Sequence, residues 1–273
     1  MTTPMTRIDQ HQFGPWAVVT GASSGIGKEF ARQLAASGLH LVLVARRLSL
    51  LEDLGNQLAN QFGVSYRAVE VDLTEPDFLD TIEAATRDLD VGLLVSNAGA
   101  VTIGEFLASE RSTLDQSVRL NVLAHLSLVQ HYSHQLAKRG RGGMLLVSST
   151  SATHGAPLTA DYAAAKAYIL MLGEALHLEF QPRGLYLTVL LPGPTATEGV
   201  AALGLDLPMK LMSVEQCVAE GLAALQANRA THIAGRMNRL MAALIPGFLM
   251  RRIIGTMHAR ALANRRAPAV QAS

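Results

Sequence analysis

Short runs of β-branched and aliphatic residues alternate with stretches of helical periodicity along most of this chain. Parallel strands need a crossover helix between them, so this alternation predicts a parallel sheet covered by helices on both faces. Six strands are expected in residues 15–20, 39–45, 64–71, 91–97, 142–149 and 184–193, and residues 231–235 add a seventh. We therefore expect an α/β fold with a doubly wound parallel sheet of about seven strands.

A glycine-rich segment, TGASSGIG, follows the first expected strand and opens the first expected helix. Its glycines, Gly21, Gly25 and Gly27, have the spacing GxxxGxG. Glycine suits a turn with positive φ and lets the backbone approach a pyrophosphate, whose charge a helix N-terminus favours. Such a string also occurs in ordinary tight turns, but its place after the first strand favours a dinucleotide site. The segment predicts a Rossmann-type, NAD(P)-binding domain.

The end of the second expected strand carries Arg46 and Arg47, and the next acidic residue is Glu52. A site that prefers NAD places a carboxylate near this point, on the ribose 2′-hydroxyl, whereas an arginine suits a 2′-phosphate. We expect NADP(H) to be preferred, with Arg46 as its reader and NAD(H) as the second choice. The alternative is a surface arginine at a strand end.

Tyr162 and Lys166 are four residues apart in a helical stretch, so they lie on one helix face. A nearby ammonium favours the phenolate and draws the pKa of a tyrosine down, which makes Tyr162 a candidate general acid or base. The YxxxK pattern alone is also common on plain helix surfaces.

Six motifs together resemble the short-chain dehydrogenase/reductase family in its shorter, single-domain branch. They are TGASSGIG, SNAG, Asn121 in RLNVLAH, a serine thirteen residues before Tyr162, YAAAK and PGPTAT. They occur in the order and spacing of that family, from about residue 13 to residue 235. The thirteen-residue spacing selects Ser149 rather than Ser148, which we expect to face the core.

The resemblance implies four catalytic residues. Ser149 would orient the substrate oxygen and Tyr162 would transfer the proton. Lys166 would hold the nicotinamide ribose and lower the pKa of the tyrosine, and Asn121 would anchor a water that links Lys166 to solvent. An alkoxide formed by hydride transfer needs hydrogen-bond donors and a proton nearby, which agrees with this set.

The resemblance also implies the cofactor site. Asp72 would lie on the adenine side, Asn97 to Gly99 beside the adenosine, and Pro192, Gly193 and Thr197 near the nicotinamide carboxamide. Ser96 and Thr195 depart mildly from the family pattern. The full expected cofactor set is Gly21, Ser23, Ser24, Gly25, Ile26, Gly27, Arg46, Asp72, Leu73, Asn97, Ala98, Gly99, Tyr162, Lys166, Pro192, Gly193 and Thr197.

Several histidines could suggest a metal site. His125, His131 and His134 share one expected helix between about residues 112 and 138, but no carboxylate or cysteine completes a ligand pattern. We expect no metal. His154 follows Ser149 by five residues and is a candidate for substrate binding rather than catalysis.

The C-terminal segment is basic and apolar. All 22 acidic residues lie at or before Glu220, whereas eight arginines follow it. The apolar run from Leu240 to Met250 is broken by Pro246 and Gly247 and is too short to span a bilayer. Subunit packing and contact with a membrane surface both stay open for this tail, of which we favour subunit packing. We expect no nucleic-acid partner.

The chain as a whole is expected to form one domain over residues 1–273, with a core over about residues 13–235 and a helical tail over residues 236–273. Cys217 is the sole cysteine and the N-terminus lacks a signal-like apolar stretch, so we expect a cytoplasmic protein, with a membrane-peripheral location as the alternative.

The expected activity is NADP(H)-dependent reduction of a ketone or oxidation of a secondary alcohol by a dimer or tetramer. Met209, Met212 and the leucines between Val200 and Leu211 could line an apolar substrate pocket or merely pack a loop, so an apolar or lipid-like substrate is our hypothesis. Two other classes stay open. One is a dinucleotide-binding redox sensor without turnover, which would bind NADPH but oxidise it with no carbonyl. The other is a membrane-peripheral protein that acts through its tail, which liposome flotation would reveal.

Overall fold

One parallel sheet organises the molecule. The computed structural model describes residues 7–204 and 211–266, and within them the sheet has seven strands in the order β3-β2-β1-β4-β5-β6-β7. The expected doubly wound sheet is confirmed, including its seventh strand. The strands are β1 (Trp16–Thr20), β2 (His40–Ala45), β3 (Tyr66–Glu70), β4 (Val91–Ser96), β5 (Gly142–Val147), β6 (Leu185–Leu191) and β7 (Thr231–Ile233).

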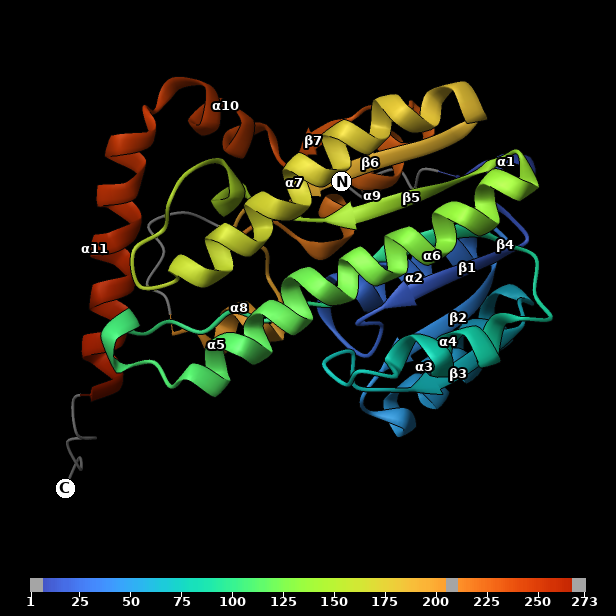
Figure 1. Ribbon diagram of the computed structural model, residues 1–273, viewed down its shortest axis with the longest axis horizontal. Helices are drawn as coiled ribbons and strands as arrows, with labels where there is room; N and C mark the ends of the chain where they lie inside the picture. The colour runs from blue at the N-terminus through green and yellow to red at the C-terminus, as the bar shows by residue number, and fades with distance from the viewer. Residues whose placement is uncertain (1–6, 205–210, 267–273) are drawn as a thin grey trace.

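Helices cover both faces of this sheet (Figure 1). Helices α2, α3 and α9 pack on one face, and α4, α6 and α7 pack on the other. The helices are α1 (Gln10–Phe13), α2 (Gly25–Ala36), α3 (Leu48–Phe62), α4 (Phe78–Thr86), α5 (Arg111–Val118), α6 (Ala124–Arg139), α7 (Ala160–Phe180), α8 (Glu198–Ala202), α9 (Val214–Gln226), α10 (Arg236–Leu244) and α11 (Gly247–Arg266).

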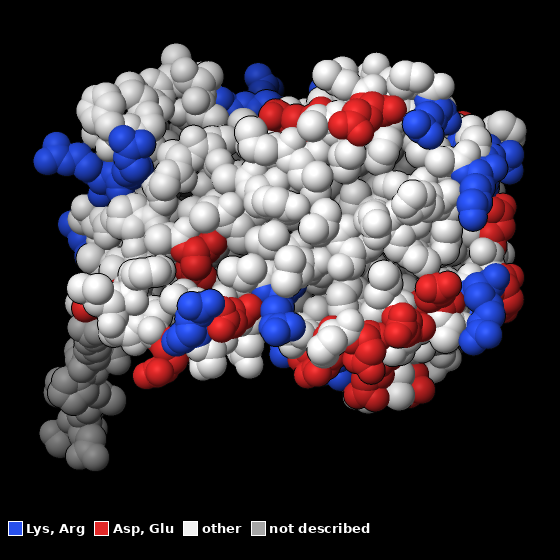
Figure 2. Space-filling model, viewed as in Figure 1, with Lys and Arg blue, Asp and Glu red and all other residues white. Residues whose placement is uncertain are grey.

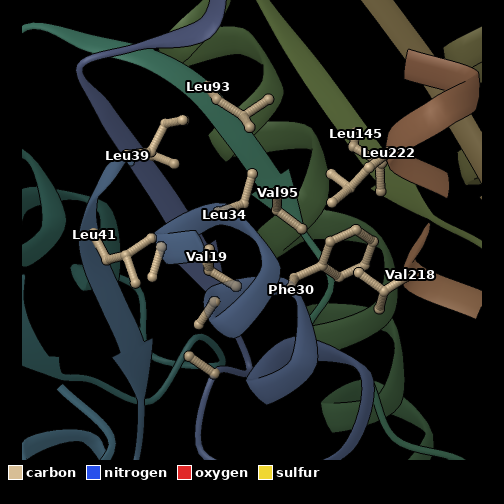
Figure 3. Close-up of a cluster of buried hydrophobic side chains, with 14 of the residues drawn as sticks. Val19, Phe30, Leu34, Leu39, Leu41, Leu93, Val95, Leu145, Val218 and Leu222 are labelled. Atoms are coloured by element: carbon tan, nitrogen blue, oxygen red, sulfur yellow. The ribbon is translucent and has the colours of Figure 1, made fainter. Parts of the chain in front are cut away.

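The core has two halves because the central strands are buried on both sides. Val19 of β1 points toward Phe30 and Leu34 of α2, and Val218 and Leu222 of α9 complete that half (Figure 3). Alternate residues of the same strands, such as Val18 and Leu94, pack against α4, α6 and α7. This double burial explains why the strand sequences are continuously apolar rather than alternating.

The long helix expected between about residues 112 and 138 is continuous but not uniform. A π-helical turn, η2 (Arg119–Leu123), separates α5 from α6. The amide of Ala124 donates to the carbonyl of Arg119, five residues earlier, so one extra residue is accommodated in the turn. That turn contains the buried Asn121, and π-helical turns are frequent at functional sites.

The tail is anchored by Glu220 of α9. Its Oε2 accepts hydrogen bonds from Gly235 N at 2.9 Å and from Arg239 Nη1 at 2.7 Å, and it lies 3.0 Å from His232 Nε2. Burial raises the pKa of Glu220, but hydrogen bonds from Gly235, His232, Arg239 and Gln216 outweigh it and bring the pKa to about 2. Glu220 thus ties α9 to β7 and α10.

Beyond this anchor, Pro246 separates α10 from α11, as its lack of an amide proton leads one to expect. Within residues 7–204 and 211–266, none of the helices combines the length and the apolar character needed to cross a membrane.

We predict that Glu220→Gln lowers the free energy of unfolding by about 2 kcal/mol at pH 7, because charge-assisted hydrogen bonds are lost. A carboxyl group whose pKa is lowered by folding stabilises the folded state above its unfolded pKa, and loses that contribution as the pH falls through its folded value. The difference between wild type and variant should therefore be full above pH 4.5 and shrink toward pH 2. Urea denaturation across this pH range measures the difference.

Asp115→Asn, which breaks the exposed pair with Arg111, is the control and should change stability far less. Equal losses in the two variants would contradict the prediction.

Candidate active site

The candidate site residues meet at the carboxyl ends of the strands. The connection after β1 leads to α2 on one face, and those after β4 and β5 lead to α6 and α7 on the other. In doubly wound sheets, ligands bind in the crevice where the chain leaves in opposite directions from neighbouring strands. Here that point lies between β1 and β4.

The glycine-rich turn after β1 has a conformation in which side chains at the glycine positions would collide with neighbouring atoms. Gly21 has a φ of +68°, and a Cβ on Gly27 would lie 2.2 Å from Gly21 O. Thr20 ties the turn to the end of β4, since its Oγ1 accepts from the amides of Asn97 at 2.9 Å and Ala98 at 3.1 Å. Asn97 Nδ2 also donates to Thr20 O at 2.9 Å. The backbone amides of this turn and of the first residues of α2, which begins after Ser24, could hold a pyrophosphate.

Two arginines lie beside this turn. Arg46 Nη1 is 3.8 Å from Asp72 Oδ2, and the Arg46 side chain is 75% exposed. Arg47 Nη2 donates to Ser23 Oγ at 3.0 Å. The sequence interpretation singled out Arg46 and missed Arg47, although its place directly after Arg46 could have drawn attention to it.

The side chain of Asp72 stabilises the turn that follows it. Its Oδ1 accepts from the amide and the hydroxyl of Thr74, at 2.9 Å and 2.8 Å. The next residue, Leu73, is buried in the core, and Ile26 of α2 packs on the other half of the core. The side chain of Leu73 is thus structural, whereas that of Ile26 is only partly buried.

Lys166 is buried at the end of β5. Its Nζ donates to Val147 O at 2.9 Å, and its own carbonyl accepts from Ser148 Oγ at 2.7 Å. Ser148 therefore faces inward, as its sequence position led us to expect, and holds α7 against the strand. Burial lowers the pKa of Lys166 to about 8.

Tyr162 and Ser149 lie next to this lysine. The ammonium of Lys166 is 5.8 Å from the centre of the Tyr162 ring, and Tyr162 is hydrogen-bonded to Ser149. Burial raises the pKa of Tyr162, while the bond to Ser149 acts in the opposite direction. The expectation that Lys166 lowers the pKa of Tyr162 is therefore wrong here, because burial raises that pKa. The phenol is protonated at neutral pH, which is the form that can donate a proton.

Asn121 meets Lys166 at Gly99. Asn121 Nδ2 donates to Ala100 O at 2.9 Å, and its Oδ1 accepts from Ala100 N at 3.1 Å. A Cβ on Gly99 would lie 2.9 Å from Asn121 Oδ1 and 3.1 Å from Lys166 Nζ. Glycine at this position keeps the space in front of both groups open.

His125 has a role that the sequence interpretation did not find. Its Nδ1 is 2.7 Å from Ser96 Oγ and its Nε2 is 3.0 Å from Ala98 O. The carbonyl can only accept, so Nε2 carries a proton and Nδ1 accepts from the serine. Burial and the charge of Lys166 lower the pKa of His125 to about 3, so the ring is neutral. His125 and Ser96 thus fix the turn from Asn97 to Gly99, and the unusual Ser96 was the signal available in the sequence.

The remaining cofactor candidates lie after β6. A Cβ on Gly25 would lie 3.2 Å from Thr197 Cγ2, so Thr197 closes over the glycine-rich turn. A Cβ on Gly193, which follows Pro192, would lie 2.4 Å from Asn238 Nδ2, so α10 packs directly on this segment. The candidate cofactor residues thus lie on the segments that follow β1 to β6, at the carboxyl edge of the sheet.

The tail packs beside the loop that follows Ser149. His258 Nδ1 donates to Pro157 O at 2.9 Å, so α11 packs on the loop that leads from Ser149 to α7. His154 lies in that loop and is partly buried, with its Cβ 3.9 Å from where a Cβ on Gly247 would lie. Met212 packs on the core, and Met209 lies outside the described residues.

No group of three potential metal-ligating side chains occurs among the residues that the structure describes. His125 is committed to Ser96 and Ala98, and His131 is hydrogen-bonded to Gln135. His125 and His131 therefore have protein partners.

Comparisons with known proteins agree with this geometry. Residues 15–207 match the family described as short chain dehydrogenase. A 7beta-hydroxysteroid dehydrogenase of Mediterraneibacter gnavus is 31% identical over 188 residues, which are 69% of this chain and 72% of that protein.

Two solved structures share the fold over nearly the whole chain. One, from work on 7beta-hydroxysteroid dehydrogenase stereoselectivity, has a TM-score of 0.84 at 27% identity and covers 91% of this chain and 99% of the other. A short-chain dehydrogenase from Sphingobium yanoikuyae in complex with NADPH has a TM-score of 0.77 at 29% identity, covering 95% and 99%. The chain is therefore a member of the short-chain dehydrogenase/reductase family, an oxidoreductase family acting on alcohol and carbonyl groups.

Proposed function

We propose that the chain interconverts a ketone and a secondary alcohol with NADP(H) as its cofactor. The observation that carries this proposal is the group formed by Ser149, Tyr162 and the buried Lys166 beside the glycine-rich crevice. A side chain at Gly27 or Gly99 would collide with its neighbours, and the glycines leave backbone that a dinucleotide can approach, which supports a dinucleotide site here. When bound, the reduced nicotinamide would supply the hydride.

The protein's own part of the reduction concerns the oxygen atom. The Ser149 hydroxyl would donate to the substrate carbonyl and hold it beside Tyr162. As hydride adds to the carbonyl carbon, the π electrons move to oxygen, and Tyr162 passes its proton to the developing alkoxide. The Lys166 ammonium would stabilise the resulting phenolate and, with a pKa of about 8, can exchange protons near neutral pH.

The preference for NADP(H) is supported by the two arginines. Arg46 and Arg47 lie at the end of β2, and Arg47 already contacts the glycine-rich turn through Ser23. Two guanidinium groups favour a 2′-phosphate and offset the carboxylate of Asp72. The NADPH complex of the Sphingobium yanoikuyae relative supports the same choice.

We propose a bulky apolar substrate, such as a sterol-like or other lipid-like alcohol or ketone. The similarity to 7beta-hydroxysteroid dehydrogenases supports it. The tail supports it as well, since α11 adds a wall beside the loop of Ser149.

We also propose a homo-oligomer, formed through the face of α5, η2, α6 and α7. Large apolar side chains are exposed on it, and Figure 2 shows few charges across its centre. Obligate interfaces have this apolar character. The exposed apolar residues are Val118, Leu123, Leu126, Tyr168, Met171 and Leu178.

Tyr162→Phe should lower kcat by roughly 100-fold to 10,000-fold, because the proton donor is lost. NADPH affinity, measured by nicotinamide fluorescence, should stay within about threefold, since the ring remains. Tyr168→Phe removes a hydroxyl from the same helix at an exposed position and should leave both quantities unchanged. Full activity in Tyr162→Phe would remove the basis of the mechanism, whereas NADPH binding without turnover in the wild type would favour a redox sensor.

Arg46→Ala should weaken NADPH binding by about tenfold or more and leave NADH binding unchanged, because only NADPH carries the 2′-phosphate. Arg47→Ala should have a similar but separate effect. Titration of both cofactors into each variant by fluorescence measures it, with Arg87→Ala, directly after α4, as the control. If NADH binds as tightly as NADPH to the wild type, the cofactor assignment is wrong.

Met171→Glu together with Leu126→Glu should shift the protein toward monomers, because it buries charges in the proposed interface. Light scattering after size exclusion gives the molar mass. A wild type that is itself monomeric at micromolar concentration would contradict the proposed oligomer.

A further inference from the structure

The corner between α10 and α11 exposes large apolar side chains. Leu244 is 69% exposed and Phe248 is 63% exposed, so most of each side chain lies in water. Exposed apolar clusters of this kind mark interaction surfaces. We call this set the apolar corner; it comprises Met237, Leu240, Leu244, Phe248, Leu249 and Ile253.

The corner is held in place from behind. Gly255, His258 and Ala261 share the inner face of α11, where His258 bonds to Pro157 O and a Cβ on Gly255 would lie 3.2 Å from Pro157 Cγ. Ile253 lies five residues before His258, on the other side of the helix, and Phe248, near the start of α11, is exposed as well. The apolar side chains therefore project outward from an anchored helix.

Basic side chains surround the corner. Arg236 precedes Met237. On α11, the exposed Arg252 shares a face with Phe248, and the exposed Arg260 shares a face with Ile253. The chain has eight arginines and no acidic residue after Glu220. Figure 2 shows basic side chains at the end of the molecule where α11 lies. Apolar and aromatic residues flanked by arginines are typical of helices that lie in the surface of an anionic bilayer.

A second copy of the chain fits this surface less well. A two-fold contact through the corner would bring the same arginines together, and like charges repel. A contact with the acidic part of another copy would be head-to-tail, a type of interface less common than the two-fold contact of dimers. The face of α5 to α7, which has few charges at its centre, offers a better subunit contact.

We propose that the apolar corner docks on an anionic phospholipid surface, with Leu244 and Phe248 inserted among the lipids and Arg252 and Arg260 on the phosphates. Because α11 backs onto the loop of Ser149, docking would bring the substrate side of the crevice close to the membrane. Docking does not require the proposed reaction, so the two can fail separately.

The test is flotation of the full-length protein with two kinds of vesicle, phosphatidylcholine alone and phosphatidylcholine with phosphatidylglycerol. The wild type should float with the anionic vesicles only, and less as salt is raised. Leu244→Glu with Phe248→Glu should abolish flotation. Arg252→Gln with Arg260→Gln should weaken binding by roughly fivefold for each charge removed.

The matched control is Arg87→Gln with Arg183→Gln, which makes the same change in net charge on exposed arginines outside the tail. It should float like the wild type. The proposal is overturned if the wild type does not float, if it floats equally with neutral vesicles, or if the control loses as much binding as the tail variant. It is also overturned if Leu244→Glu with Phe248→Glu lowers the molar mass in light scattering while the wild type ignores vesicles, because the corner would then be a subunit interface.

Discussion

The attachment of α7 to the end of β5 determines the rest of the candidate site. Ser148 Oγ donates to the carbonyl of Lys166, and Lys166 Nζ donates back to the carbonyl of Val147. Both bonds are buried, so breaking either would leave a polar group without a partner in the interior, at a cost of about 1 to 3 kcal/mol. They fix the rotation of α7 and hence the place of Tyr162, one helical turn before Lys166. Burial of Lys166 in this contact also lowers the pKa of its ammonium group. The position of the lysine and its readiness to lose a proton therefore have the same cause.

Much of this arrangement could be predicted from the sequence, because it depends on local periodicity and on motifs with fixed spacing. The alternation of apolar runs and helices predicted the seven-stranded sheet, and the family's spacing of thirteen positions before Tyr162 selected Ser149 rather than its neighbour. The π-helical turn at Asn121 could not be predicted, because an added residue in a helix leaves no clear trace in periodicity. The residues around it read as one long helix.

Contacts between distant segments were also out of reach. In the sequence, Ser96 was a minor departure from a family pattern, and His125 was one of three histidines on an expected helix. In the fold, the two side chains are hydrogen-bonded to each other, and His125 also bonds to Ala98 O, so together they hold the turn after β4. Nothing in the separate positions of the two residues indicates this contact. Arg47 was missed for the same reason, since its bond to Ser23 joins segments more than twenty residues apart.

The tail connects the candidate reaction to the candidate partner surface. Glu220 fixes the start of α10, Asn238 packs on Gly193 in the crevice, and His258 holds α11 against the loop after Ser149. Asn238 and His258 therefore hold the tail against two segments of the candidate site, the one that follows β6 and the one that follows β5. These contacts are tight, because a Cβ on Gly193 would overlap Asn238 and a Cβ on Gly255 would lie 3.2 Å from Pro157 Cγ. The proposed membrane surface and the proposed reaction thus depend on the same packed contacts, since interiors of this density tolerate little change in volume.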